Sequence, residues 1–502
     1  MNAPTSTPRS RFYRAWAVAV LVGLASEVVL HLLVHTWHFA PLVAFENWAF
    51  DGTMRLQAGF DRPAAPDARD LTLVDIDDAT WRDPAWGGGE PQRAPRAALF
   101  NLVDAAFRYG AQQVVLDVLV EERTQVDRSA AQAAESNEDS EFVANLSKLL
   151  AKPWFGQDRQ LILVRTIRKP LGAAEGPAGQ ENEQTTLRRR RLGELRSSPG
   201  LDALVRQSGG RIGLAAPYFL LDSDQTLRSW QLFKPACSVV GREGAEEVRF
   251  VPSVQLLVFL KNSGVGPERR DQLSRGPASV QAASACASGA KVDERTGVRQ
   301  ADVRALEDGY WQALRAAVCR NGSPQCKLAK YLPESENLAD RVIFRYAPRR
   351  AGLLVNVLPA SDLLTGRLPE SALGSQLLDR VVIIAQSFEE AGDRHSTPLG
   401  ELTGGWVLVN AIDSLAREQV VQRPSNGVLW TIVLVECSVV GWVFTVRHSL
   451  VAAILLAVGM TAVLIPVSYI GFKVGVWLDF AFPVLGIFLH RLLHGDGSTG
   501  HH

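Results

Sequence analysis

The sequence predicts an α/β domain, with a mixed or mostly parallel sheet and helices on its faces, between one N-terminal and three C-terminal transmembrane helices. Charged residues are concentrated between residues 40 and 425, whereas both flanks are apolar. Within the middle region, short apolar strands alternate with amphipathic helices, which is typical of α/β proteins. The chain has 502 residues, of which 47% are hydrophobic, so it can bury a large core.

The first transmembrane helix is predicted at residues 15–34, which read AWAVAVLVGLASEVVLHLLV. About twenty apolar residues span a hydrocarbon core of roughly 30 Å. Three arginines precede this segment, Arg9, Arg11 and Arg14. The positive-inside rule therefore places residues 1–14 in the cytoplasm and the following region, residues 35–426, in the periplasm of a bacterial cell.

Three further spans are predicted near the C-terminus, at residues 428–446, 450–470 and 474–489. Four crossings return the chain to the cytoplasm, so residues 490–502 form a predicted cytoplasmic tail. The sequence thus predicts a multi-pass protein of the bacterial inner (plasma) membrane, with the lipid bilayer as its first partner.

Three ionisable residues lie deep inside the predicted spans. Glu27 and His31 are four residues apart and share a helix face, and Glu436 is near the middle of the second span. Charged groups at this depth are costly and are usually buried against partners. We favour a neutral hydrogen-bonded cluster that joins the first two spans, over a proton path or a coupling site for a partner helix.

The exported region begins with a strand-helix-strand unit. Residues 71–77 and 113–117 are predicted strands, and residues 97–109 form the helix between them, which Gly110 ends. Such a unit implies parallel neighbours and a right-handed crossover. The same alternation continues with strands at 161–164, 212–216, 342–346 and 381–385 and a helix at 406–417.

Two polar segments, near residues 124–200 and 262–338, interrupt this pattern and are predicted insertions. The polar region contains four cysteines, Cys237, Cys286, Cys319 and Cys326. An oxidising periplasm allows two disulfides, Cys319 with Cys326 and Cys237 with Cys286. Four free, partly buried thiols are the alternative. No CxxC spacing occurs, so a zinc ribbon is not expected.

Enzymatic chemistry is not expected. Away from the spans and the tail the only histidine is His395, and no Gly-x-Ser-x-Gly elbow accompanies it. We therefore predict no catalytic residue, no metal site and no cofactor. Lys+Arg and Asp+Glu both number 53, so net charge gives no argument for a nucleic-acid partner.

Polar residues nevertheless gather at predicted strand ends, where α/β sheets place their ligands. The candidates are Asp75, Asp77, Arg93, Asp117, Asp393, His395 and Thr397. They form either a small-ligand pocket or a buried ion-pair network in which Arg93 bridges Asp75 or Asp117. The sequence slightly favours the structural interpretation, and a catalytic carboxylate dyad is the least favoured one.

Several motifs resemble a known family. They are Leu73-Val-Asp-Ile-Asp77, Gln113-Val-Val-Leu-Asp117, Asp222-Ser-Asp-Gln-Thr-Leu-Arg228, Val251-Pro-Ser-Val-Gln255 and Asp379-Arg-Val-Val-Ile-Ile-Ala385. Together with the closing spans they are similar to the CHASE domain of the second type, an extracellular sensory domain. Gln225 stands where the family usually has glycine, and Leu408 where it often has histidine.

The resemblance implies a module that receives a stimulus. In the family a cyclase or kinase domain normally follows the last helix, whereas only residues 490–502 follow here. The leading hypothesis is a sensory or regulatory subunit that signals through its helices to a separate membrane-embedded or cytoplasmic effector, or through self-association, with an unknown ligand. The alternatives are a structural or assembly subunit of a larger envelope complex, and a transporter or proton-conducting subunit.

Overall fold

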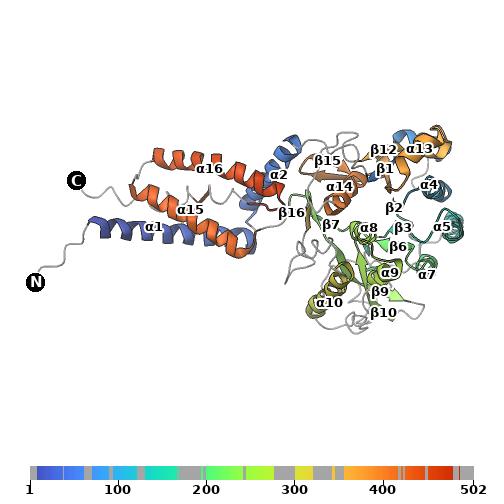
Figure 1. The fold of residues 1–502 in the computed structure, drawn as a ribbon, viewed down its shortest axis with the longest axis horizontal. Helices are drawn as coiled ribbons and strands as arrows, with labels where there is room; N and C mark the ends of the chain where they lie inside the picture. The colour runs from blue at the N-terminus through green and yellow to red at the C-terminus, as the bar shows by residue number, and fades with distance from the viewer. Residues whose placement is uncertain are drawn as a thin grey trace, which may run out of the picture. The chain divides into compact units, whose positions relative to one another are not determined.

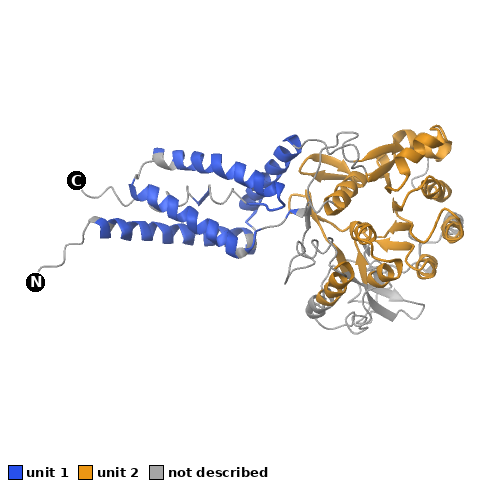
Figure 2. Cartoon of the chain, in the orientation of Figure 1, with its two compact units in different colours: residues 1–61, 421–502 blue, residues 62–420 orange. Residues whose placement is uncertain are grey.

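The computed structural model of the chain divides into two compact units (Figure 2). Unit 1 comprises Met1–Asp61 and Val421–His502, and unit 2 comprises Arg62–Val420. The structure describes residues 8–37, 39–60, 70–89, 94–120, 130–165, 167–168, 194–195, 199–240, 245–275, 300–319, 342–344, 355–416, 420–421, 424–446, 450–478 and 485–486.

Unit 2 is built around a six-stranded sheet with the order β12-β1-β13-β2-β3-β6, in which every neighbouring pair is parallel. Its strands are β1 (Leu71–Ile76), β2 (Gln113–Asp117), β3 (Gln160–Val164), β6 (Ile212–Ala215), β12 (Asn356–Pro359) and β13 (Val381–Gln386). The strands read as continuous apolar runs because both faces of a parallel sheet are buried. The predicted α/β class is confirmed.

Helices cover both faces of this sheet (Figure 1). On one face lie α4 (Arg96–Arg108), α5 (Ala130–Leu149), α7 (Pro199–Gln207), α12 (Ala360–Thr365) and α13 (Glu370–Leu377). Leu99, Phe142 and Leu373 from these helices share one core with Val74 and Val382 of the sheet. The alternate strand positions face α8 (Val254–Asn262) and α14 (Gly404–Ala416), which pack against each other on the second face.

Smaller elements complete unit 2. One sheet has the order β10-β9-β5-β4 and another has the order β16-β11-β8-β7. Their strands are β4 (Ile167–Arg168), β5 (Glu194–Leu195), β7 (Phe219–Leu221), β8 (Leu227–Trp230), β9 (Phe233–Val240), β10 (Ala245–Pro252), β11 (Val342–Phe344) and β16 (Val420–Val421). A hairpin is formed by β14 (Arg394–Thr397) and β15 (Gly400–Thr403). The predicted strand near 342 thus pairs with β8 rather than with the parallel sheet.

Three further helices belong to unit 2. The short helix α3 (Asp78–Arg82) follows β1, and α9 (Pro267–Arg275) follows α8. Helix α10 (Gln300–Val318) and α9 lie within the segment predicted as the second insertion, as α5 lies within the first. Tyr310 of α10 is fully buried and stacks on Phe250 with ring centroids 4.6 Å apart. These segments therefore contribute aromatic side chains to the interior of the unit.

Unit 1 consists of helices. Helix α1 (Pro8–His31) continues into the π-helical turn η1 (Leu32–Thr36), and α2 (Ala40–Phe60), α15 (Asn426–Val446) and α16 (Leu450–Lys473) follow. Three stretches are long and apolar enough to cross a membrane, Phe12–Val34, Gly427–Val446 and Ile454–Lys473. They match the first three predicted spans.

The fourth predicted span, residues 474–489, is not among the candidate membrane helices of the described residues. The chain turns directly after α16, because Val476 N donates to Gly471 O at 2.8 Å and Gly475 has φ of +82°. Ser468 Oγ then donates to Leu478 O at 2.6 Å, so Leu478 folds back beside the helix. An αL glycine commonly ends a helix in this way. A continuous helix from Val474 was therefore a wrong prediction; residues 479–484 and 487–489 lie outside the described residues.

Helices α1 and α15 run antiparallel in close contact. A Cβ placed at Gly23 would lie 3.0 Å from Cys437 Sγ, and one at Gly441 would lie 3.3 Å from Ala19 Cβ. Trp16 Nε1 donates to Ser438 O at 3.0 Å. Small residues allow two helix backbones to approach closely, which stabilises helix pairs in lipid by dispersion contacts.

The contact between α14 and the sheet gives a stability prediction. A Cβ at Gly405 would lie 2.5 Å from Ala385 Cβ in β13. Gly405→Ala should therefore lower the free energy of unfolding by about 1–3 kcal/mol, because the helix must move away from the sheet. Gly374→Ala is the matched control: Gly374 lies inside α13 with no atom within 4 Å of its Cβ position. It should be neutral or stabilising by up to about 1 kcal/mol. Denaturant unfolding followed by circular dichroism measures both, and equal losses would contradict the prediction.

Candidate functional site

The carboxyl ends of the central strands bring two predicted site residues to one place. The register pairs Asp75 of β1 with Ala385 of β13, and Ala385 with Asp117 of β2. Directly paired residues of parallel neighbours point to the same face of a sheet. Asp75 and Asp117 therefore flank Ala385 on the face that α14 covers.

Asp393, just before β14, and His395, within β14, lie near Asp117 at the same end of the sheet. A Cβ at Gly404, the first residue of α14, would collide with the Asp393 carboxylate. Gly404 N donates to the backbone oxygen of Asp393 at 3.1 Å. Asp393 Oδ1 lies 2.9 Å from His395 Nε2. A carboxylate at the N-terminus of a helix is also favoured by the helix dipole.

These groups influence one another electrostatically. Desolvation raises the pKa of the Asp117 carboxyl to about 7; the neighbouring Asp393 charge raises it as well, and His395 lowers it. The hydrogen bond to Asp393 raises the pKa of His395, which desolvation partly offsets. Both groups thus keep their protons to higher pH than they do in the unfolded chain.

Other predicted members of the site have different roles. Asp77 is the N-cap of α3, and its Oδ1 accepts from Thr80 N at 2.8 Å. Thr397 closes the turn of the β14–β15 hairpin, where its Oγ1 donates to Gly400 O at 2.6 Å. Arg93 lies outside the described residues, so its proposed bridge to Asp75 or Asp117 stays a prediction. The cluster defined by the structure is therefore Asp75, Asp117, Asp393 and His395, which we term the edge cluster.

The edge cluster can exchange protons and offer hydrogen bonds to a polar ligand. The described residues contain no group of three or more His, Cys, Asp or Glu side chains arranged to hold a metal ion. The Asp117 carboxyl, with a pKa of about 7, changes charge within the physiological range, and it interacts electrostatically with Asp393 and His395. The arrangement therefore fits a pH-dependent or ligand-dependent switch better than an ion pair that serves stability alone.

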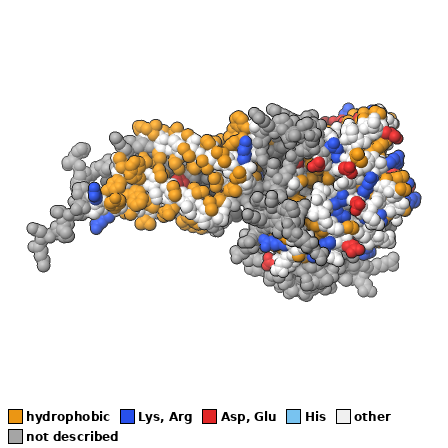
Figure 3. Space-filling view, in the orientation of Figure 1, with side chains coloured by type: hydrophobic (Ala, Val, Ile, Leu, Met, Phe, Trp, Pro, Cys, Tyr) orange, Lys and Arg blue, Asp and Glu red, His pale blue; other side chains and the backbone are white. Residues whose placement is uncertain are grey.

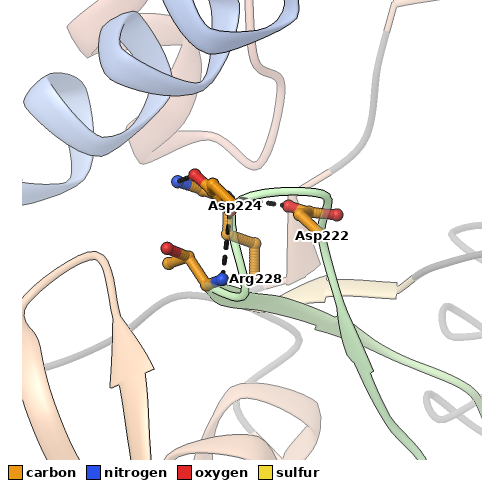
Figure 4. A network of polar contacts seen from close by, with 4 residues as sticks. Asp222, Asp224 and Arg228 are labelled. Atoms are coloured by element: carbon orange, nitrogen blue, oxygen red, sulfur yellow. Dashed lines mark hydrogen bonds and ion pairs between the residues drawn. The ribbon is translucent and has the colours of Figure 1, made fainter. Parts of the chain in front are cut away.

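A second polar network lies in the turn between β7 and β8, which sequence reasoning treated only as a family motif (Figure 4). Arg228 Nη1 and Nη2 donate to Asp224 Oδ1 and Oδ2 at 2.9 and 2.8 Å. Arg228 Nη1 also donates to Asp222 Oδ2 at 3.0 Å. Gln225, where the family usually has glycine, has φ of +60°. The turn thus keeps a left-handed residue without glycine, held by the surrounding hydrogen bonds.

Burial makes this network important for stability. The Arg228 side chain is 6% exposed, whereas that of Asp224 is 39% exposed. The hydrogen bond from Arg228 lowers the pKa of Asp224. An arginine that follows two acids across a turn is the sequence signal for this network, but its burial is visible only in the structure.

The predicted intramembrane residues are divided between interior and surface of unit 1. Glu27 of α1 and Glu436 of α15 are both buried, and a Cβ at Gly486 would collide with Glu27 Oε1. Glu436 Oε2 has no hydrogen-bond partner among the described residues. His31 is exposed instead, with its ring centroid 6.5 Å from that of Trp430. The three residues therefore do not form one buried cluster.

The predicted disulfides remain predictions. Cys286 and Cys326 lie outside the described residues, and so does the side chain of Cys237. The structure therefore gives no geometry for the Cys237–Cys286 pairing or for the Cys319–Cys326 pairing. Cys437 in α15 is a free, buried cysteine.

The pKa shifts of the edge cluster predict a specific pH dependence. The unfolded chain ionises Asp117 near pH 4, whereas the folded chain does so near pH 7, so this group lowers stability as pH rises between the two values. His395 acts in the same direction, because its stabilising contribution is lost as pH rises through its raised pKa. Asp117→Asn should remove the first effect. Relative to the wild type, its free energy of unfolding should increase by up to about 3 kcal/mol between pH 5 and pH 8.

Denaturant titrations of the full chain in nanodiscs at several pH values measure this difference. The double variant Asp117→Asn, His395→Gln should depend still less on pH. If the free energy of unfolding of the wild type and of the Asp117→Asn variant changed in parallel with pH, this carboxyl would not be desolvated.

Arg228 predicts a second stability effect. Arg228→Met leaves the Asp222 and Asp224 carboxylates without their shared partner and should cost about 3–5 kcal/mol of unfolding free energy. The control is Arg367→Met, which removes an ion pair of 3.3 Å to Asp83 from a side chain that is 60% exposed. This change should cost less than about 1 kcal/mol. Thermal and denaturant unfolding measure both, and similar losses would refute the assigned role of Arg228.

Comparison with known proteins gives a family assignment. A family model described as the CHASE2 domain matches residues 27–448. Comparisons with curated proteins and with solved structures gave no match. The matched region begins within α1, contains all of unit 2 and ends just after α15. The chain belongs to the CHASE2 family of sensory domains.

Proposed function

We propose that this chain is a sensory or regulatory subunit of the bacterial inner membrane. In this proposal unit 2 lies in the periplasm and responds to a stimulus, and the helices of unit 1 pass the response to a separate effector protein. The chain itself carries no catalytic site, cofactor or nucleic-acid partner. Its partners are the lipid bilayer and a membrane-embedded or cytoplasmic effector, or a second copy of the chain.

The observation that carries this proposal is the extent of the family match. It covers the α/β unit together with the last turn of α1 and all of α15, which is one of the three helices that can cross a membrane. A sensory domain and a membrane helix within one family region support a role in transmembrane signalling. In the family that the sequence resembles, a cyclase or kinase domain normally follows the last helix, which suggests the class of effector.

The connectivity of the chain supports a route for the signal. Asp75 and Asp117 of the edge cluster lie on β1 and β2, and the Asp393 carboxylate lies beside Gly404 at the start of α14. Among the described elements, β1 is the first strand after α2, and α14 is the last helix before α15. The edge cluster thus includes or contacts two elements that are near the helices of unit 1 in the sequence. A change in protonation or ligand binding can bias both connections at once.

A disulfide lock between α1 and α15 tests the signalling role. A Cβ at Gly23 would lie 3.3 Å from Cys437 Cβ, close to the separation of about 3.5–4.5 Å found in disulfides. Gly23→Cys should therefore form a disulfide with native Cys437 when a membrane-permeable oxidant is added. If a response requires α1 to move against α15, oxidation should abolish it and a reductant should restore it.

The measurement uses native membranes that contain the wild-type or variant chain. Cyclic-nucleotide production and protein phosphorylation are compared between pH 5.5 and pH 8, and after addition of periplasmic extract. Gly459→Cys, on α16 with no atom within 4 Å of its Cβ position, is the control and should respond as the wild type in both redox states.

The alternative is a structural or assembly subunit of a larger envelope complex. It predicts co-purification with that complex at fixed stoichiometry and no output that depends on the chain. If removal of the chain changes neither measured activity under any condition, the signalling proposal fails and this alternative is favoured.

A further inference from the structure

Helix α2 has an unusual distribution of polar and apolar side chains. It is a helix of 21 residues, Ala40–Phe60, in unit 1. Its buried residues include four polar ones, Glu46, Asp51, Thr53 and Gln57. Its exposed residues include Trp48, Leu56 and Phe60, with exposed fractions of 62%, 43% and 71%. The other buried residues are Ala49, Phe50 and Met54, so apolar side chains lie both inside and on the exposed face. A helix in water keeps its large apolar side chains mainly on the face toward the core.

Contacts with α16 show where α2 lies within unit 1. Phe50 packs against Phe472 and Trp477 with ring centroids 5.7 and 5.1 Å apart, and Phe60 packs against Tyr469 at 6.2 Å. From Phe50 to Phe60 the helix axis advances about 15 Å, whereas from Phe472 to Tyr469 it advances only about 5 Å. Helix α2 therefore crosses the last turn of α16 rather than running beside it, as Figure 1 also shows.

The chain that precedes α2 also ends a candidate membrane span close to it. The candidate membrane span of the first helix ends at Val34, and α2 begins at Ala40 after the turn η1. The candidate span of α16 ends at Lys473. Helix α2 follows the end of one candidate span and packs against the end of another, so it lies at one boundary of the apolar part of unit 1. On the face drawn in Figure 3, apolar side chains cover most of this unit.

We infer that α2 is an interfacial helix that lies in the membrane surface, with Trp48, Leu56 and Phe60 inserted at the boundary between headgroups and acyl chains. The partner of this surface is the lipid bilayer. Trp48 stacks on Phe45 with ring planes 11° apart and centroids at 5.8 Å, which presents a rigid aromatic face. Aromatic residues favour this depth because one part of the ring is apolar and another is polar. Interfacial helices commonly have 20–30 residues and one large apolar face.

A lipid surface fits this face better than a second copy of the chain. Helix pairs in membranes associate through small residues that allow close backbone approach. The face of α2 instead projects the aromatic side chains of Trp48 and Phe60, and Trp37 and Phe39, just before the helix, are also exposed at 66% and 50%. This arrangement resembles the aromatic belt of a membrane protein. The inference requires only that unit 1 crosses a membrane, and it is independent of the signalling proposal.

Fluorescence quenching by spin-labelled lipids tests this inference. The full chain with Trp48→Cys, and separately with Leu56→Cys, is labelled with bimane and reconstituted in vesicles of phosphatidylethanolamine and phosphatidylglycerol. Lipids that carry the spin label near the headgroup should quench either site at least twofold more than lipids labelled deep in the acyl chain. The wild-type chain, treated identically, gives the background from native cysteines.

Two control positions calibrate the depth. Val463→Cys lies in the middle of the candidate span of α16 and is 60% exposed, so deep labels should quench it most. Ser371→Cys is exposed on α13 of unit 2 and should be quenched by neither lipid. Two outcomes would overturn the inference: no lipid quenching at both α2 sites, or cross-linking of Trp48→Cys between copies together with protection from lipid quenching. The second outcome would identify the face as a contact between two copies.

Discussion

The close approach of α14 to the central sheet is the constraint on which the arrangement of unit 2 depends. Gly405 lacks a side chain, so the helix backbone can reach Ala385 in the middle strand of the sheet. Because β13 lies between β1 and β2, Asp75 and Asp117 lie on either side of this contact. The start of the helix also positions Asp393, which interacts electrostatically with Asp117. One steric requirement thus brings together groups from four separate segments of the chain.

The two polar networks of unit 2 use burial in opposite ways. In the edge cluster, desolvation favours the neutral form of Asp117, whose protonation therefore changes near neutral pH, and the hydrogen bond to Asp393 favours protonated His395. In the β7–β8 turn, Arg228 satisfies two carboxylates and keeps Asp224 ionised to lower pH. The first arrangement is easily altered by a proton or a polar ligand, whereas the second resists change. A responsive site supported by a rigid scaffold is what a sensory domain requires.

The side chains of unit 1 are distributed as expected for helices in an apolar environment. Glycines at positions 23 and 441 allow α1 and α15 to approach closely, while Glu27 and Glu436 are kept inside. Helix α2 buries four polar residues beside Phe50 and Met54 and exposes Trp48, Leu56 and Phe60. The fold-back after α16 provides Trp477 as a packing partner for Phe50. Such a distribution suits the lipid bilayer, which is the partner that we propose for this unit.

The sequence by itself determined the local elements: the β1, α4, β2, β13 and α14 segments were predicted to within two residues, because hydrophobic periodicity and glycine stops are local signals. The family and three membrane helices were predicted for the same reason. Tertiary structure alone decided that β13 lies between β1 and β2, which places Asp75 and Asp117 on either side of Ala385. It also decided which side chains of α2 are buried. These features depend on which distant surfaces meet, and no local pattern carries that information.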